Sequence, residues 1–232
     1  METKNDHIYK KLVGKGLLKK QVYKNTLEVF QEFKMVADLV RFEADRRLSG
    51  DGHPLRVEFR DKGAFEGELR FAGDTLIFNM HTNVFEFSRV HEVMKTPYIK
   101  EDPERSYCGV INIFNFLTDS FRYNRMNDFG YLVARVFINK EKFFLVEGKH
   151  QNNFYYNQFM TEPITQANMR QIIESAMSYS IDFDLLVPPY DMVKETTVSD
   201  VIENSFNLKT RTGKRMGFKF QADHDQHKAE DS

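Results

Sequence analysis

The sequence predicts an α+β fold with N-terminal helices, an antiparallel meander sheet of about seven strands, a C-terminal helix and a flexible tail. Three observations predict it. Residues 1–50 repeat apolar side chains at helical spacing, residues 55–87 alternate apolar and polar side chains, and residues 163–180 return to helical spacing. Helices that flank a run of short antiparallel strands are typical of α+β domains.

The first helical region has a clear apolar stripe. Its stripe residues recur at spacings of three, four and seven: Leu18, Val22, Val29, Phe33, Val36 and Val40. Gly14 and Gly16 are poor helix-interior residues, so we expect them to separate a short first helix from a longer one. The long helix is expected to end near Leu48, because Ser49-Gly50-Asp51-Gly52 supplies turn residues and Pro54 prevents a restart.

Four short strands are predicted next, in residues 55–60, 65–71, 76–80 and 85–87, joined by tight turns. Residues 89–106 are polar and are expected to form a loop or an irregular crossing.

A buried strand is predicted for residues 107–116, and residues 117–127 are ambiguous between helix and loop. Residues 130–138 and 142–149 flank Asn139-Lys140-Glu141 and predict a hairpin. Pro163 is expected to open the last helix.

Composition bounds the class of protein. The chain has 232 residues, of which 41% are hydrophobic and 29% charged, and a single cysteine, Cys108. A chain of this length buries roughly 70% of its unfolded surface and needs no metal or disulfide to fold. The first residues contain no apolar leader, and no apolar run reaches the 18 or so residues of a membrane span. We therefore expect a cytoplasmic protein without a membrane partner.

The expected organisation has three parts. Residues 1–50 form an N-terminal helical segment that packs on the sheet, residues 51–190 form the α+β core, and residues 191–232 form an extended, partly disordered basic tail. Charge differs along the chain: residues 1–50 have 11 basic and 7 acidic side chains, residues 51–204 have 16 and 23, and residues 205–232 have 6 and 4. The formal net charge of −1 is thus an average over unlike parts.

The tail gives one hypothesis about function. Its cations, interleaved with phenylalanines and free of acids up to residue 222, are Lys209, Arg211, Lys214, Arg215 and Lys219. Such an arm could neutralise phosphates and stack bases, which predicts weak nucleic-acid contact. The alternative is a solvated basic terminus that folds back on the acidic middle of the chain.

The predicted hairpin carries the one catalytic constellation. Alternation places Glu147 and Lys149 on the same face at the end of one strand, and Asp128 lies at the beginning of its partner. In an antiparallel pair the start of one strand lies beside the end of the other. The three side chains are therefore expected to converge. Two carboxylates would bind a divalent cation such as Mg²⁺, which would activate water, and Lys149 would stabilise the developing charge.

This arrangement resembles the Asp…Glu-x-Lys pattern of the restriction-endonuclease-like nuclease superfamily. The resemblance rests on three positions and implies a metal-dependent nuclease, with Glu32 or Glu43 as an optional further carboxylate. The superfamily's sheet is mixed and has a crossover helix, whereas the pattern here predicts a meander. The alternative is an exposed ion pair at the end of a hairpin.

Other sites have less support. The histidines at positions 81, 91 and 150 form no HxxxH or HExxH pattern, and Cys108 lies in an apolar strand where a free thiol is usually packing. Among the aromatic residues, Phe154, Tyr155 and Tyr156 follow the hairpin in a polar setting and could contact a partner or line a pocket.

We therefore expect a non-catalytic binding or regulatory module with an unknown protein partner, or self-association through the long helix. No metal or other cofactor is expected outside the nuclease alternative.

Overall fold

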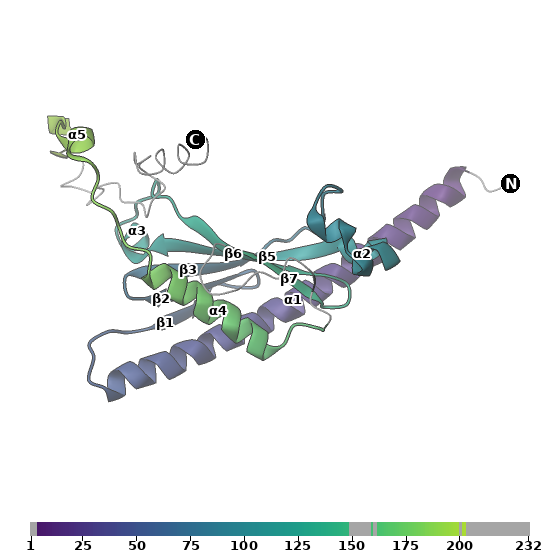
Figure 1. Cartoon of the computed structure of the whole chain (residues 1–232), viewed down its shortest axis with the longest axis horizontal. Helices are drawn as coiled ribbons and strands as arrows, with labels where there is room; N and C mark the ends of the chain where they lie inside the picture. Colours follow the sequence, from purple (N-terminus) through teal and green to yellow (C-terminus); the bar gives the residue numbers. More distant parts are fainter. Residues whose placement is uncertain (1–3, 149–158, 160–161, 200, 203–232) are drawn as a thin grey trace, which may run out of the picture.

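The computed structural model describes residues 4–148, 159, 162–199 and 201–202. It confirms the α+β class: a long N-terminal helix, an antiparallel sheet with seven strands in the described part of the chain, and later helices (Figure 1). No helix among the described residues combines the length and apolar character that crossing a bilayer requires.

Helix α1 (Lys4–Gly50) is continuous, so the expected break at Gly14 and Gly16 is wrong. Nothing lies within 4 Å of a Cβ built at either glycine. No tertiary contact therefore forces a turn there, and a glycine in a helix costs only about 1 kcal/mol. All six residues of the predicted apolar stripe are buried, as expected.

The sheet is antiparallel throughout, and its six main strands follow the order β1-β2-β3-β5-β6-β7. These strands are β1 (Glu58–Asp61), β2 (Glu66–Phe71), β3 (Asp74–Met80), β5 (Tyr107–Leu117), β6 (Tyr131–Ile138) and β7 (Phe144–Gly148). The predicted hairpin is confirmed as β6 and β7, with Ile138 paired to Phe144.

The segment predicted as a fourth meander strand has a different place. Strand β4 (Phe85–Glu86) is two residues long and pairs with the beginning of β5, at Cys108 and Tyr107. It does not continue the meander because β5 pairs along the whole length of β3 and occupies that side of the strand.

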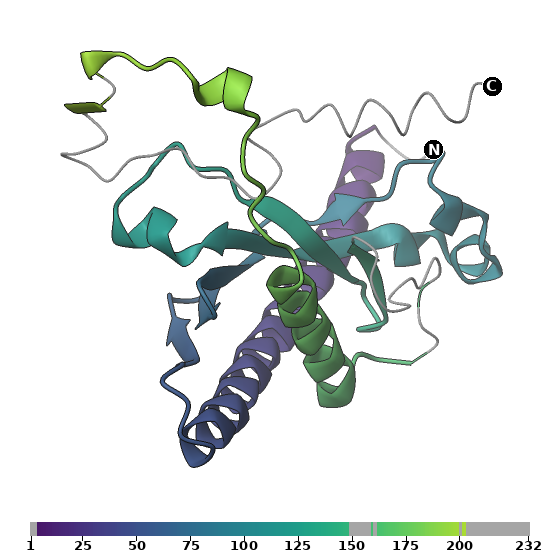
Figure 2. The same ribbon diagram turned by 60° about the vertical axis from the view of Figure 1, so that its left-hand side comes forward.

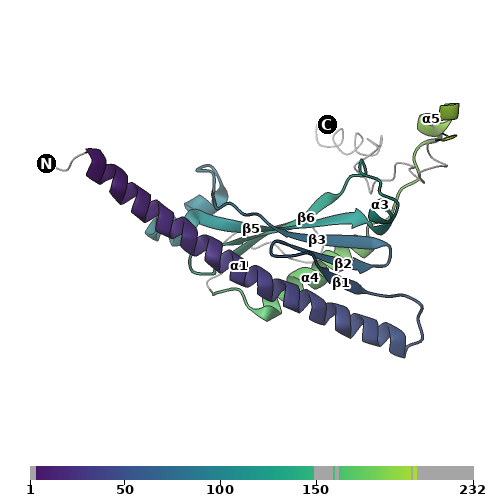
Figure 3. The same cartoon turned by 180° about the vertical axis from the view of Figure 1, so that it is seen from behind.

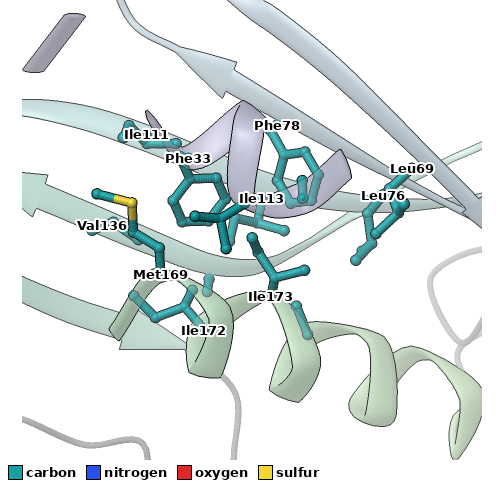
Figure 4. Close-up of a cluster of buried hydrophobic side chains, with 14 of the residues drawn as sticks. Phe33, Leu69, Leu76, Phe78, Ile111, Ile113, Val136, Met169, Ile172 and Ile173 are labelled. Carbon is teal, nitrogen blue, oxygen red and sulfur yellow. The ribbon is translucent and has the colours of Figure 1, made fainter. Parts of the chain in front are cut away.

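The main core lies between the sheet and the two helices α1 and α4 (Gln166–Ile181), which cover the same face (Figures 2 and 3). Phe33 of α1 packs edge to face on Phe78 of β3, with ring centroids 5.3 Å apart. Met169, Ile172 and Ile173 of α4 enter the same cluster (Figure 4). Helix α4 begins after Thr165, which forms a capping box with Asn168.

A second cluster covers part of the opposite face. It is built on short helices where the sequence predicted a loop: η1 (Glu92–Lys95), α2 (Pro97–Glu101) and η2 (Pro103–Ser106). Polar contacts tie these helices to the turn between β6 and β7, because Glu141 accepts hydrogen bonds from the Tyr98 hydroxyl at 2.7 Å and from Arg105 Nε at 3.0 Å.

Candidate functional site

Glu147, one of the predicted nuclease residues, has two partners in the structure. It lies opposite Arg135 in the β6–β7 register and forms an ion pair with it. Its Oε1 also lies 3.1 Å from Nε2 of His91, just before η1. The carboxylate therefore joins the short helices to the sheet.

Asp128 lies in a different place, in the loop between α3 (Thr118–Arg122) and β6. Its buried carboxylate accepts a hydrogen bond from Ser120 Oγ at 2.7 Å and lies 3.9 Å from Arg125.

The two carboxylates are not brought together. Glu147 pairs with Arg135, which lies four residues after Tyr131, the first residue of β6. At 3.3 Å per residue, Arg135 and Tyr131 are about 13 Å apart along the strand. Asp128 lies three residues further back. Lys149, the third member, is outside the described residues. In the part of the chain that the structure describes, no three His, Cys, Asp or Glu side chains are grouped to hold a metal ion.

His91 has both ring nitrogens engaged. Nδ1 accepts a hydrogen bond from the backbone N–H of Val93 at 3.2 Å, and Nε2 faces Glu147. The geometry therefore assigns His91 to capping η1 and docking it on β7.

Cys108 is buried in β5, and burial raises the pKa of its thiol well above the usual range. The thiolate is the nucleophilic form, so burial and the raised pKa both disfavour a role as nucleophile.

The described residues contain a pocket of about 690 Å³ at the end of the sheet where α4 finishes. Its walls come from the β2–β3 turn, the end of β5, the α3 region and the segment after α4. The lining residues are Ala72, Gly73, Asp74, Leu117, Asp119, Arg125, Ile181, Phe183, Asp184 and Leu185.

The β2–β3 turn that forms one wall is held firmly. Ala72 and Gly73 both have positive φ, at 45° and 87°, as a tight two-residue hairpin turn requires. At the end of β5, Thr118 donates its backbone N–H to Gly73 O at 2.8 Å and its hydroxyl to Asp74 O at 2.9 Å. The turn and the start of α3 thus form one rigid rim.

Asp74 is the most buried carboxylate in this pocket, with 4% of its surface exposed. Nδ2 of Asn115 donates to Asp74 Oδ1 at 3.1 Å and to the Tyr131 hydroxyl at 3.0 Å. Burial raises the pKa of Tyr131, which keeps this hydroxyl neutral over the physiological range. Phe183 packs against the Tyr131 ring at 5.2 Å and links the network to the pocket wall.

The electrostatics of the pocket are asymmetric. Three acidic side chains, Asp74, Asp119 and Asp184, and one basic side chain, Arg125, are among the described residues of the lining, and Asp119 also pairs with Arg122 at 3.6 Å. Arg125 also lies beside Asp128, which adds another negative group behind it. The other side chains in the lining are apolar, and Leu117, Ile181, Phe183 and Leu185 supply its hydrophobic surface.

Sequence reasoning missed this pocket. Its residues come from segments more than 100 positions apart, and each segment has only an ordinary signal of its own, a turn or a helix end. The predicted partner residues Phe154, Tyr155 and Tyr156, and the tail cations Lys209, Arg211, Lys214, Arg215 and Lys219, lie outside the described residues.

Comparison with known proteins gives no relative. No family model matches the chain, and the searches of curated proteins and of solved structures find no significant similarity to it.

Proposed function

We propose that this chain is a non-catalytic binding module whose ligand, a small organic cation with an apolar group, binds in the pocket at the end of the sheet. The observation that carries the proposal is the combination of three acidic side chains, one of them the buried Asp74, with apolar walls in one pocket. Sites for small molecules typically combine mostly apolar walls with a few placed polar groups.

The charge of the pocket selects the class of ligand. An ammonium group placed beside Asp119 and Asp184 gains attraction from more than one acidic side chain, whereas Arg125 is the one basic side chain among the described lining residues. Near a protein surface, with an effective dielectric constant of about 20, opposite charges 4 Å apart attract by roughly 4 kcal/mol before desolvation is subtracted. A cation is therefore favoured over a neutral or anionic analogue of the same shape.

Binding is favoured over turnover because the lining residues that the structure describes include no nucleophile paired with a base. Among the described residues, the lining has carboxylates, one guanidinium and apolar groups, and includes no histidine, cysteine, lysine or serine. The nuclease alternative gains no support from the described carboxylates, since Asp128 and Glu147 are engaged with separate partners.

Three ligands of one shape test the proposal: benzylammonium, benzyl alcohol and benzoate, followed by chemical-shift changes in isotope-labelled protein. For so small a ligand we expect benzylammonium to bind with a Kd on the order of 1 mM, and the other two to bind more weakly. The affected amides should be those around Gly73, Leu117 and Phe183.

Variants then locate the site. Asp119→Asn and Asp184→Asn should each weaken benzylammonium binding about two- to five-fold, the range of an exposed ion pair. Glu92→Gln removes the same charge from an exposed position on η1 and serves as the control. Equal binding of all three ligands, or equal affinity in all variants, would show that the pocket is not a cation site.

A further inference from the structure

Helix α1 has an exposed apolar side at its N-terminal end, between residues 8 and 17. In this stretch the apolar pairs at positions 8–9 and 12–13 alternate with Lys10-Lys11 and Gly14-Lys15, and Gly16-Leu17 follows. At about 100° per residue, the apolar positions cover one half of the helix and the lysines lie on the other half. The large apolar side chains, called the N-terminal face from here on, are 37–69% exposed: Ile8, Tyr9, Leu12, Val13 and Leu17.

The N-terminal face is directed away from the body of the molecule. Its centre lies about 150° around the helix from Leu18 and Val22, which are buried. On the inner side, Lys15 Nζ lies 5.7 Å from the centre of the Tyr107 ring. Figures 1 and 3 show this end of α1 extending past the strands. The outer half of the helix is therefore open to a partner, whereas the inner half reaches β5 at Tyr107.

The same end of the chain is basic. Residues 5–24 contain six lysines and one acidic residue. Lys24 pairs with Glu28 at 3.7 Å, whereas Lys20 forms no ion pair with another described residue. Residues 51–204 instead contain 16 basic and 23 acidic side chains. An anionic surface would therefore attract this end of α1 and repel the acidic part of the fold, which favours the N-terminal face as the point of contact.

We propose that this chain binds the surface of an anionic lipid membrane through the N-terminal face of α1. The five apolar side chains would enter the boundary between headgroups and acyl chains, and this part of the helix would lie in the plane of the surface. Helices with one apolar side and a lysine-rich remainder bind bilayers in this way. Lys20 lies three residues after Leu17, on the same outer half of the helix, and would contact the lipid phosphates.

A peripheral contact of this kind needs neither a membrane-spanning helix nor a leader. The sequence-based expectation of no membrane partner considers only those two features, and the exposure of the N-terminal face belongs to the tertiary structure. The contact is also separate from the pocket at the end of the sheet. This proposal and the proposed function can therefore fail independently.

The apolar and the basic side chains together select the partner. A nucleic acid would bind the lysines but would leave the apolar side chains in water. A deep groove in an acidic protein would contact more than one side of the helix, whereas the inner side already lies beside Tyr107. A bilayer needs only the outer half. Tyr9 also fits it, because a tyrosine at the interface has its ring in an apolar layer and its hydroxyl in a polar one.

The size and charge of the N-terminal face set the expected strength. A lysine near an anionic membrane surface increases the binding constant about five-fold, and salt screens that contribution. The apolar side is only about three helical turns long. We therefore expect a reversible, salt-dependent attachment, in contrast to the permanent insertion of a membrane-spanning helix.

Flotation of the whole chain with large unilamellar vesicles tests the proposal. One set of vesicles is phosphatidylcholine alone, and the other contains about one third phosphatidylserine, which supplies a negative surface potential. We expect binding to the anionic vesicles at about 0.05 M salt and at least ten-fold weaker binding at about 0.5 M salt. The neutral vesicles should bind at least ten-fold more weakly than the anionic ones at low salt.

Variants locate the contact on α1. Leu12→Glu should weaken binding to anionic vesicles at least ten-fold, because it replaces an apolar side chain with a negative charge. Lys20→Glu should weaken it on the order of twenty-fold, since the charge changes by two. Val90→Glu and Lys194→Glu make the same changes at exposed positions outside α1 and should bind like the wild type. Circular dichroism checks that each variant is folded.

A fluorescence experiment tests whether the N-terminal face enters the bilayer. The chain has no tryptophan, so Leu12→Trp places a single reporter on the face. Its emission should shift to shorter wavelength with anionic vesicles and should be quenched by brominated acyl chains, and Val90→Trp should show neither change. Binding without a shift at Leu12→Trp would overturn the insertion of this face. Absence of binding to anionic vesicles at low salt, or equal binding by wild type, Leu12→Glu and Lys20→Glu, would overturn the whole proposal, even where an acidic protein or a second copy binds the face instead.

Discussion

The ammonium group of Lys34 lies 2.8 Å from both carboxylate oxygens of Asp61, joining the middle of α1 to the end of β1. The two side chains differ in exposure: 6% for Lys34 and 58% for Asp61. Lys34 also donates to Gly63 O at 2.9 Å. A buried cation on the core side of a helix is thus satisfied by the β1–β2 turn, which fixes the edge of the sheet against α1.

This pair predicts a pH-dependent stability. Hydrogen bonds from Lys34 and from the Gly63 N–H lower the pKa of Asp61 below its usual value. A lowered pKa in the folded state means that the stabilisation is present above the unfolded pKa of about 3.9 and is lost as the pH falls toward the folded value. Because Asp61 is more than half exposed and solvent screens the pair, Asp61→Asn should cost about 0.5–1 kcal/mol at pH 7.

Urea unfolding of the wild type and of Asp61→Asn, at pH 7 and at pH 3, measures this effect. The difference in unfolding free energy should shrink at pH 3, because the wild-type carboxylate is then partly protonated. A difference that stays constant between the two pH values would show that charge on Asp61 is not what stabilises the fold.

A second prediction concerns the contact between α1 and β5. A Cβ added at Gly109 would lie 2.1 Å from Thr26 Oγ1 and 2.7 Å from its Cβ, so the helix would have to shift. Gly109→Ala should destabilise the protein by about 1–3 kcal/mol. Gly16→Ala, on the open part of the same helix, should stabilise it by about 0.5–1 kcal/mol. Thermal unfolding of both variants checks the opposite signs, and a neutral Gly109→Ala would contradict this packing.

A third prediction concerns Cys108. Because burial raises the pKa of its thiol and covers the sulfur, we expect almost no reaction with a disulfide reagent at pH 8 in the native protein. One thiol per chain should react at once in concentrated guanidinium. Rapid reaction of the native protein would mean that β5 opens readily at this position.

A fourth prediction addresses the nuclease alternative. Since Glu147 is engaged with Arg135 and His91 and does not meet Asp128, we expect no Mg²⁺-dependent cleavage of DNA by the purified chain. Instead, Glu147→Ala should loosen η1, seen as faster amide exchange at Val93 and Met94. Cleavage by the wild type that is lost in Glu147→Ala would restore the nuclease hypothesis.

Much of the secondary structure follows from the sequence. The spacing of Leu18 to Val40 predicts the buried side of α1, and two-residue alternation predicts β2, β3 and the β6–β7 hairpin. These patterns arise because one side of each element is buried. The spacing of apolar residues within a short stretch of sequence is enough to show which side that is. The same logic failed at Gly14 and Gly16, where the weak local preference of glycine for a break was outweighed by the rest of the helix.

The sites depend on contacts that no local pattern records. His91 meets Glu147 across 56 positions, and the pocket gathers a turn, a strand end and the segment after α4. Strand β4 pairs with Tyr107 and Cys108 at the beginning of β5, and β3 pairs with the later part of β5, from Ile111 to Leu117.

The sequence by itself therefore determined the class of fold and the buried side of its main helix, since periodicity is a local property of the chain. Only the tertiary structure decided which carboxylates meet and which apolar side chains of α1 stay exposed. Those outcomes depend on the packing of segments that are far apart in the chain.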